Sequence, residues 1–510
     1  MIRRFVPCMP LSRLAAVLVV SLVLAACAPR APVVNMPTAD ARAAIAARLD
    51  ADVAALAADA MGGRKPGTEG GRATYDYIER RMGEFGLLSG TNDPGSYWRQ
   101  TVDLLETAPE TGQLTLGQGR RRVVIPVEDA AVFTPRRRAL AFGGPGTGVP
   151  VVFVGYGDGS VLGDALAGAV AVMLADPGRD GARRDALFRQ RATAVLTVLP
   201  DSGALDTVRR IEGRTRLQLA ADEQDTLAAY ITDRAFADVI GARRWKSLRA
   251  EAEDAAFAPL ELNLSVAIEA TADRREFPSQ NVIGMIPGSQ PGSGAVLLLA
   301  HWDHLGECGP PAAADRICNG AADNASGVAM MLELARRLKA GPPLGRDIYV
   351  LATTAEEAGL LGIRAFVRDP PVPLASIVAA FNFDMMAVAP AAAPLGFIGR
   401  GQNADLDAAI LAAAARAGRK IGDQSLADSF LPRQDGWVLV QAGVPTVLLS
   451  STYGSRGILD PFLATRYHQP SDEAGQIEYG GAIDDLLLHE DLIRKIADPE
   501  RYPATAPAQP

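Results

Sequence analysis

The chain has 510 residues, of which 48% are hydrophobic and 22% are charged, a mixture typical of globular proteins and too apolar for a disordered chain. Its net charge of −8 argues against a nucleic-acid-binding protein that depends on a basic surface. Four cysteines are too few for a disulfide-rich scaffold, and the length suggests about two or three domains.

Residues 1–26 predict an export signal. Three arginines precede the apolar run LAAVLVVSLVLAA, which is the order of a secretory signal peptide. The run ends in Leu24-Ala25-Ala26-Cys27, which resembles the bacterial lipobox and predicts a lipid on Cys27. A Pro- and Ala-rich tether follows at 27–38. We expect a protein whose lipid anchor is its only contact with a membrane, attached to the outer membrane and facing the periplasm. A plain secretory signal and an uncleaved anchor are the alternatives.

Beyond the tether, helical and strand patterns alternate. The first helix carries Ile45, Leu49 and Val53 at helical spacing, and GGRKPGTEGG at 62–71 is a Gly-rich loop. Between about 110 and 270 the chain has short β-rich runs such as VPVVFVGYG and TAVLTVL. From 281 to 495 helices alternate with the apolar runs NVIGMIPG, AVLLLA, DIYVLATT, IVAAFNFD and VPTVLLSS.

This alternation of strands and helices predicts an α/β fold with a mixed, mostly parallel central sheet flanked by helices. We expect one discontinuous domain formed by residues 39–115 and 270–497. A β-rich domain is inserted at 116–269, and the last residues, 498–510, are predicted to be a disordered tail.

Residues of the types that commonly bind metals follow the predicted strands. His301 follows AVLLLA, Asp323 precedes the next helix, and Glu356 and Glu357 follow DIYVLATT. Asp384 ends IVAAFNFD, and His468 lies in the loop after VPTVLLSS. Ligands of open α/β sheets bind at the carboxyl ends of the strands, so we expect these side chains to converge.

Each of these residues also has an ordinary structural interpretation. A histidine after a strand is more often structural, Asp323 could cap a helix, and a Glu-Glu pair is usually solvated. As a set, however, imidazole and carboxylate groups suit zinc, and one carboxylate can bridge two ions about 3.5–4 Å apart.

The surrounding stretches resemble the bacterial di-zinc aminopeptidase family over about 39–110 and 276–490. The matching segments are LLLAHWDHLG, NGAADNASGVAMMLELA, ATTAEEAGLLG, FNFDMM and YHQPSDE. The resemblance implies a zinc-exopeptidase fold with two Zn²⁺ ions per chain. One ion would be held by His301, Asp323 and Asp384. The other would be held by Asp323, Glu357 and His468, with Asp323 as the bridge.

The same resemblance makes Glu356 the general base and gives Asp303 the role of orienting His301. The sequence departs from the family at Ala322, where an Asp is common, and at Arg433-Gln434-Asp435-Gly436, which replaces a Ser-Asp segment. His304 has no assigned role, and a loop contact is favoured over metal binding. We expect His489, in a late helix, to be structural.

The insertion resembles the protease-associated domain of some family members, through VVFVGYG, GDALAGAVAVMLADPG and ATAVLTVL. It departs from that domain at Ala169, where a Lys usually follows the glycine. Such a domain would border the substrate cleft and shape access to it. The alternative is a spacer without substrate contact.

Cys308 and Cys318 flank the loop GPPAAADRI in a chain predicted to be exported. Disulfides persist outside the cytosol, so the two cysteines are a candidate disulfide. Two buried free thiols are the alternative.

The resemblance implies a zinc metallopeptidase that acts on peptides, most simply an aminopeptidase that releases N-terminal residues. A carboxypeptidase or dipeptidase on the same site is the nearest alternative, and a glutaminyl-cyclase relative is less favoured because the full two-metal set is present. A catalytically inactive binding lipoprotein is the alternative from another class, against which the intact Glu356 and the five ligands argue. The sequence predicts no oligomeric state.

Overall fold

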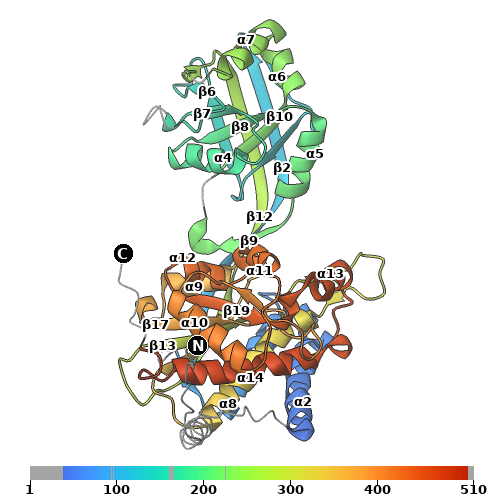
Figure 1. Ribbon diagram of the computed structural model, residues 1–510. Coiled ribbons are helices and arrows are strands. Elements are labelled where there is room, and N and C mark those ends of the chain that lie inside the picture. Colours follow the sequence, from blue (N-terminus) through green and yellow to red (C-terminus); the bar gives the residue numbers. More distant parts are fainter. Residues whose placement is uncertain are drawn as a thin grey trace, which may run out of the picture.

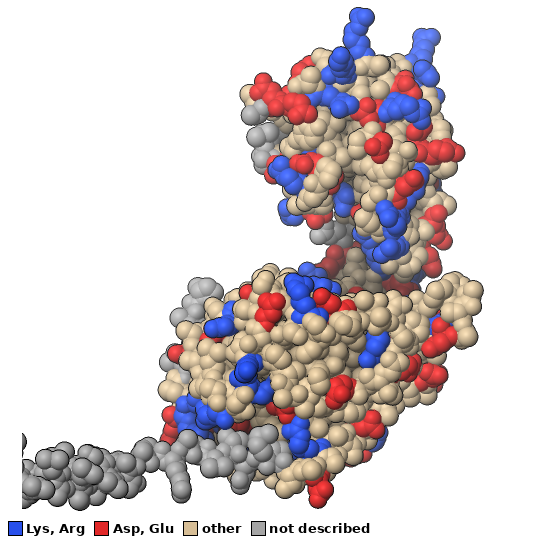
Figure 2. Space-filling model, turned by 45° about the vertical axis from the view of Figure 1, so that its right-hand side comes forward, with Lys and Arg blue, Asp and Glu red and all other residues tan. Residues whose placement is uncertain are grey.

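The computed structural model describes residues 38–503, except Pro94, Ser96, 160–165, 224–225 and Ala255. The predicted signal peptide at 1–26, Cys27 and the tether up to residue 37 lie outside the described residues. No helix in the described part of the chain is long and apolar enough to cross a bilayer. The described residues form two lobes joined by a narrow neck (Figures 1 and 2).

The larger lobe is built on a mixed sheet with the strand order β18-β19-β17-β13-β16-β12-β2-β3. Four neighbouring strands in its centre run parallel, and antiparallel strands flank them on both sides. The parallel strands are β13 (Ala295–His301), β16 (Asp347–Thr353), β17 (Ile377–Asn382) and β19 (Thr446–Ser450). The flanking strands are β18 (Gly396–Ile398), β12 (Ser265–Ile286), β2 (Arg99–Gln118) and β3 (Arg121–Val124), with β1 (Leu88–Ser89) beside β12.

Helices cover both faces of this sheet, as its unbroken apolar strands require. In β13, Val296 and Leu298 belong to the core on one face, and Leu297 and Leu299 belong to the core on the other. The first core is covered by α2 (Ala39–Leu56), α3 (Glu69–Glu84), α8 (Ser326–Ala340), α10 (Ala404–Arg416) and α14 (Tyr479–Ile496). The second is covered by α9 (Leu361–Arg368) and α12 (Gly436–Gln441).

The smaller lobe has its own six-stranded sheet, ordered β11-β6-β7-β8-β10-β4. Its strands are β4 (Ala130–Phe133), β6 (Val151–Gly155), β7 (Val170–Leu174), β8 (Ala194–Leu199), β10 (Ala228–Thr232) and β11 (Leu260–Glu261). Its helices are α4 (Asp180–Arg189), α5 (Ser202–Glu212), α6 (Asp233–Ile240) and α7 (Ala242–Ala252). The four strands from β6 to β10 are parallel, and the lobe has a separate hydrophobic core.

Two long strands connect the lobes. β2 and β12 pair antiparallel along almost their whole length, with one register shift between Thr271 and Ala272, and their upper ends carry β3 and β5 (Ala139–Gly143) (Figure 1). The predicted boundaries at 116 and 270 fall inside these two strands. The hydrogen-bonded ladder continues through them, so composition alone could not locate the junction.

A segment of the smaller lobe returns to the larger one. β9 (Arg216–Leu219) pairs with β2 near its lower end, and Asp222 forms an ion pair with Arg368 of α9. Leu219 shares a small core with Ala355 and Leu361 of the larger lobe. The smaller lobe therefore packs directly against the loop that carries Glu356 and Glu357.

The end of the described chain is packed rather than free. Tyr502 is 5% exposed, and the guanidinium of Arg346 lies 6.0 Å from its ring centroid. The tail predicted to be disordered from residue 498 is thus held against the larger lobe up to residue 503. Its last seven residues lie outside the described range.

Candidate metal centre

The predicted ligands meet at the carboxyl ends of the parallel strands. His301 is the last residue of β13, Glu356 and Glu357 follow β16, and Asp384 follows β17. Asp323 lies in the turn Ala321–Ala325 before α8, and His468 lies in the loop after α13 (Arg456–Thr465). All except His468 are deeply buried, with 10% or less of each side chain exposed. The structure thus gathers acids that are distant in sequence into one water-poor site.

The two oxygens of Asp323 face two different groups of side chains. His301 Nε2 lies 3.4 Å from Asp323 Oδ1 and 3.6 Å from an oxygen of Asp384. His468 Nε2 lies 3.4 Å from Asp323 Oδ2 and 3.1 Å from an oxygen of Glu357. Asp323 therefore lies between the two groups, in the position of a bridging carboxylate.

These separations are close to those expected between two ligands of one zinc ion. Two ligands that are each about 2.0 Å from a tetrahedral ion lie about 3.3 Å from one another. The Nε2 atom of His468 is buried and makes no hydrogen bond within the described part of the chain, although Glu357 is near. Imidazole and carboxylate groups are donors that zinc prefers, so the residues present could hold it.

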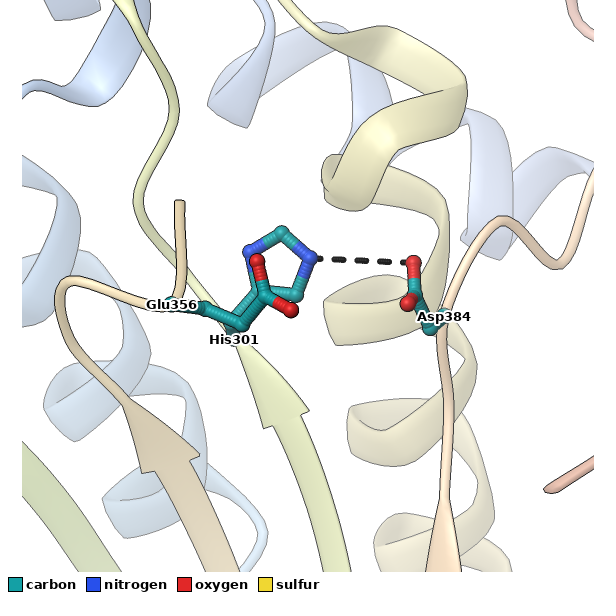
Figure 3. Close-up of side chains that lie close together, drawn as sticks. All are labelled: His301, Glu356 and Asp384. Carbon is teal, nitrogen blue, oxygen red and sulfur yellow. Dashed lines mark ion pairs between the residues drawn. The ribbon is translucent and has the colours of Figure 1, made fainter. Parts of the chain in front are cut away.

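Glu356 lies close to His301 and lines a cavity beside the site. Its carboxylate, the His301 ring and Asp384 approach one another closely enough to share an ion. In the view of Figure 3 the Glu356 carboxylate overlaps the imidazole ring, and Asp384 lies beyond the edge of that ring. Burial is the main reason that the pKa of Glu356 is raised well above its ordinary value, and Asp435 and Asp384 reinforce that shift. A carboxylate with a raised pKa is suited to accepting and returning a proton.

Asp303 has a different partner from the one expected. His301 Nδ1 lies 3.2 Å from the main-chain carbonyl of Asp303 but 3.9 Å from its carboxylate. The carboxylate instead accepts hydrogen bonds from the backbone N–H groups of Glu356, at 3.0 Å, and Glu357, at 3.4 Å. Asp303 therefore orients His301 through its backbone, and its side chain holds the loop with the two glutamates.

His304 contacts Glu357, a predicted ligand that lies in the loop after β16. Its side chain is fully buried, and Nδ1 lies 2.6 Å from an oxygen of Glu357. Its Nε2 is also buried and has no hydrogen-bond partner within the described residues. Asp323, Glu357 and His304 lie close enough together to hold an ion. The only sequence signal for this role was a histidine three positions after His301 in a chain with four histidines.

Arg64 of the Gly-rich loop supports the site from below. Its buried guanidinium donates hydrogen bonds to the carbonyls of Trp302, at 2.8 Å, Gly320, at 2.9 Å, and Asn319. Burial lowers the pKa of Arg64 to about 10. One side chain thus ties the β13 end to the turn that contains Asp323. Sequence reasoning missed it because nothing in GGRKPGTEGG marks the arginine as buried.

Two further acids stabilise the site from behind. Asp472 accepts hydrogen bonds from the backbone N–H groups of Ala322 and Asp323, both at 3.0 Å to the same oxygen. Asp435 accepts a hydrogen bond from the Thr353 hydroxyl, and burial raises the pKa of Asp435 to about 7. Asp435 belongs to the segment that departs from the family pattern, and it is 1% exposed.

A disulfide joins Cys308 to Cys318, whose Cα atoms are 5.7 Å apart. This is the candidate pairing from the sequence. The loop it closes lies between His301 and Asp323, and Cys308 is also in contact with the carbonyl of His468. The disulfide therefore holds together the segments that carry three of the predicted ligands.

Two cavities open on either side of Glu357. One, of about 540 Å³, reaches Asp303 and His304 and is closed by Arg216 and Leu217 of the smaller lobe. The other, of about 470 Å³, is lined by Glu356 and His468 on its inner side. A substrate in the second cavity would lie beside the predicted general base.

Comparison with known proteins identifies the domain that contains these residues. Residues 281–486 match the family model of peptidase family M28. The chain carries a peptidase family M28 domain. For residues 281–486, the match agrees with the predicted family and with the prediction of a peptidase.

Two further likenesses concern single proteins. A probable lipoprotein aminopeptidase, LpqL of Mycobacterium tuberculosis, is 34% identical over 123 residues, which is 24% of this chain and 22% of that protein. The solved aminopeptidase from Aneurinibacillus sp. strain AM-1 is 17% identical, with a TM-score of 0.52 over 91% of this chain and 96% of that one. The structural likeness confirms the predicted fold, which is an α/β fold with a mixed sheet flanked by helices.

Proposed function

We propose that this protein is an aminopeptidase that uses two zinc ions to release N-terminal residues from peptides. The observation that carries the proposal is Asp323, whose two oxygens each face a separate histidine and carboxylate group. One ion would be held by His301, Asp323 and Asp384. The other would be held by Asp323, Glu357 and His468.

The roles of the protein's own groups follow from their positions. Bound zinc would lower the pKa of a water molecule toward about 7 and polarise a carbonyl oxygen. Glu356 takes the proton of the attacking water at its carboxylate and returns it to the leaving amine. Asp303 keeps Glu356 and Glu357 in register by accepting from both of their N–H groups. Burial strengthens each of these electrostatic interactions.

Selectivity for a free N-terminus has a simple source. The α-amine of a substrate carries a positive charge, and Glu356, an acid beside His301 that is not assigned to zinc, would favour that charge beside the scissile bond. The names of both similar proteins, a probable lipoprotein aminopeptidase and an aminopeptidase, support the same choice.

The test is a substrate panel. The zinc-loaded mature protein should cleave aminoacyl anilides and should leave the same compounds with an acetylated N-terminus intact. The protein with Glu356→Gln, purified in parallel, controls for contaminating peptidases. Equal cleavage of free and acetylated substrates would contradict the proposal, because it would show that the enzyme does not require a free N-terminus.

The proposal also covers the N-terminal anchor and the role of the smaller lobe. We infer lipidation of Cys27 and attachment to the outer membrane, facing the periplasm, from the Leu-Ala-Ala-Cys ending of the signal. The name of the mycobacterial relative, a lipoprotein, supports a lipid anchor. Mass analysis of the native N-terminus should find acyl groups on Cys27, and an unmodified terminus would contradict it. The smaller lobe is proposed to be a protease-associated domain that limits substrate access.

A further inference from the structure

The cavity of about 470 Å³ beside His468 contains cations that the proposed chemistry does not use. Its inner wall contains Glu356, Glu357 and His468, and its outer wall carries Arg364 and Arg433. We name it the Arg364–Arg433 cleft. No carboxylate other than the two glutamates is among the described residues that line it.

The two arginines have no anionic partner in the part of the chain that the structure describes. Among the residues that the structure describes, neither guanidinium forms an ion pair or a hydrogen bond, and Arg433 lies over the ring of Phe430 at 4.9 Å from its centroid. Arg368, one helical turn after Arg364, forms an ion pair with Asp222. Arg368 therefore has an acidic partner, whereas Arg364 on the same helix has none among the described residues.

The backbone at both arginines is held by packing and hydrogen bonds, although their side chains are exposed. Arg364 lies on α9, whose Ile363 and Phe366 are buried in the core. Arg433 ends a short 3-10 helix (Leu431–Arg433) and precedes Gln434, whose side-chain oxygen accepts hydrogen bonds from Asn382 Nδ2, at 2.6 Å, and the Gly436 N–H, at 2.8 Å. The charges are therefore held at the cleft without being neutralised.

We propose that the Arg364–Arg433 cleft binds a carboxylate of the substrate, close to the bond that is cleaved. Guanidinium groups match the geometry of carboxylates and bind them more strongly than neutral acceptors. Because Glu356 lines the same cleft, a ligand there lies beside the reacting carbonyl. Two substrate groups could supply the carboxylate: an acidic side chain on the N-terminal residue, or the free α-carboxylate of a dipeptide. The inference rests on the proposed peptidase function and names its substrate class.

Matched substrate pairs distinguish the two sources. Glutamyl and glutaminyl anilides differ only in a side-chain carboxylate, and alanyl-alanine and alanyl-alaninamide differ only in the α-carboxylate. The zinc-loaded mature chain should prefer the carboxylate member of one pair by about 10- to 100-fold in kcat/KM, through KM, the scale of a hydrogen bond to a charged group. The pair that shows the preference identifies the source.

Arginine variants test whether the cleft is responsible. R364Q and R433Q should each reduce the preference, and the double variant should abolish it. R243Q removes one charge from exposed α7, at the far end of the smaller lobe (Figure 1), and should keep the preference. No preference in either pair, or a preference that survives in the double variant, would overturn the inference.

A binding measurement separates this inference from the proposed function. Calorimetry on the chain with E356Q, which should not turn substrate over, compares glutamic acid α-amide with glutaminamide and alanyl-alanine with alanyl-alaninamide. Tighter binding of a carboxylate member, lost on adding R364Q and R433Q, supports the cleft even if no substrate is cleaved. Equal binding in both pairs would overturn it, whatever the enzyme cleaves.

Discussion

Both lobes place acids after parallel strands, but they use them differently. In the smaller lobe, Asp176, Asp201 and Asp233 follow β7, β8 and β10. Asp201 caps α5, Asp176 pairs with Arg179, and Asp233 accepts from Trp245 and from Arg249. In the larger lobe, Asp323 and Asp384 are buried, face histidines, and are paired with no arginine or lysine of the described chain.

The comparison teaches that an acid at a strand end is not by itself a metal ligand. In the smaller lobe, helix caps and neighbouring cations stabilise these carboxylates. The lobe contains none of the four histidines. In the larger lobe the charges are left without a cation at a place where burial makes that costly. The predictions below change matched residues in the two lobes, from the largest expected effect to the smallest.

Glu356→Gln should lower kcat by about 10²- to 10⁴-fold, because it removes a positioned general base. Zinc content should stay unchanged, since Glu356 is proposed not to be a ligand. Asp201→Asn in the smaller lobe changes an acid at a strand end in the same way and should leave kcat unchanged. Loss of zinc in the Glu356 variant, measured by metal analysis, would instead make this residue a ligand.

The buried arginines of the two lobes form a second matched pair. Arg64 donates to carbonyls around the metal centre, and Arg183 donates to the carbonyls of Leu174 and Gly155 at 2.9 Å. Arg64→Met and Arg183→Met should each destabilise their lobe by at least about 3 kcal/mol, because several buried acceptors lose their donor.

Only Arg64→Met should also reduce zinc affinity, which a chelator competition measures. Equal zinc affinity in the Arg64 variant and the unchanged protein would show that the Gly-rich loop supports the fold alone. A lower zinc affinity in the Arg183 variant would show that the lobes are coupled more tightly than their separate cores indicate.

Acid should weaken the larger lobe through His489. This side chain is fully buried against Phe383, and burial lowers its pKa to about 4 from an ordinary value near 6.5. Below pH 6.5 the unfolded chain binds a proton at His489 that the folded chain does not bind. The contribution of His489 to the free energy of unfolding is therefore fully present above pH 6.5 and falls as the pH drops toward 4. The loss is about 3 kcal/mol. Urea unfolding at several pH values should show it, and His489→Phe should remove this component.

The smallest effect is expected at the contact between the lobes. Arg216 lines the cavity that reaches His304 and forms an ion pair with Glu212. Arg216→Ser should change KM for peptides by about two- to fivefold, the scale of an exposed charged contact, and should leave aminoacyl anilides unaffected. Arg243→Ser is the control. An unchanged KM for every peptide length would support the spacer interpretation.

Much of the larger lobe could be predicted from sequence because its signals are local. The apolar runs around Val296, Val350 and Ala379 are strands buried on both faces, and the ligands follow them directly. The roles of Arg64, His304 and the Asp303 carboxylate depend on contacts between segments far apart in the chain. A sequence pattern contains no information on those partners, so these roles emerged only from the structure.

The exact junction between the lobes and the contacts of the C-terminal end could not be read from the sequence, for a related physical reason. β2 and β12 carry one hydrogen-bonded ladder through both lobes, so no change of composition marks the junction. Tyr502 lies in a segment rich in Pro and Ala, and it is held in place by packing in the core of the larger lobe and by Arg346, whose guanidinium lies over its ring. Such isolated tertiary contacts are invisible to composition.

The central claim is that Asp323 bridges two zinc ions. A crystal structure of the zinc-loaded chain, with anomalous data collected on both sides of the zinc absorption edge, tests it most directly. The account predicts two peaks per chain, about 3.5–4 Å apart, the spacing of co-catalytic pairs. One peak should contact His301 and Asp384, the other Glu357 and His468, and Asp323 should contact both. A single peak, or a second ion held by His304 in place of His468, would contradict it.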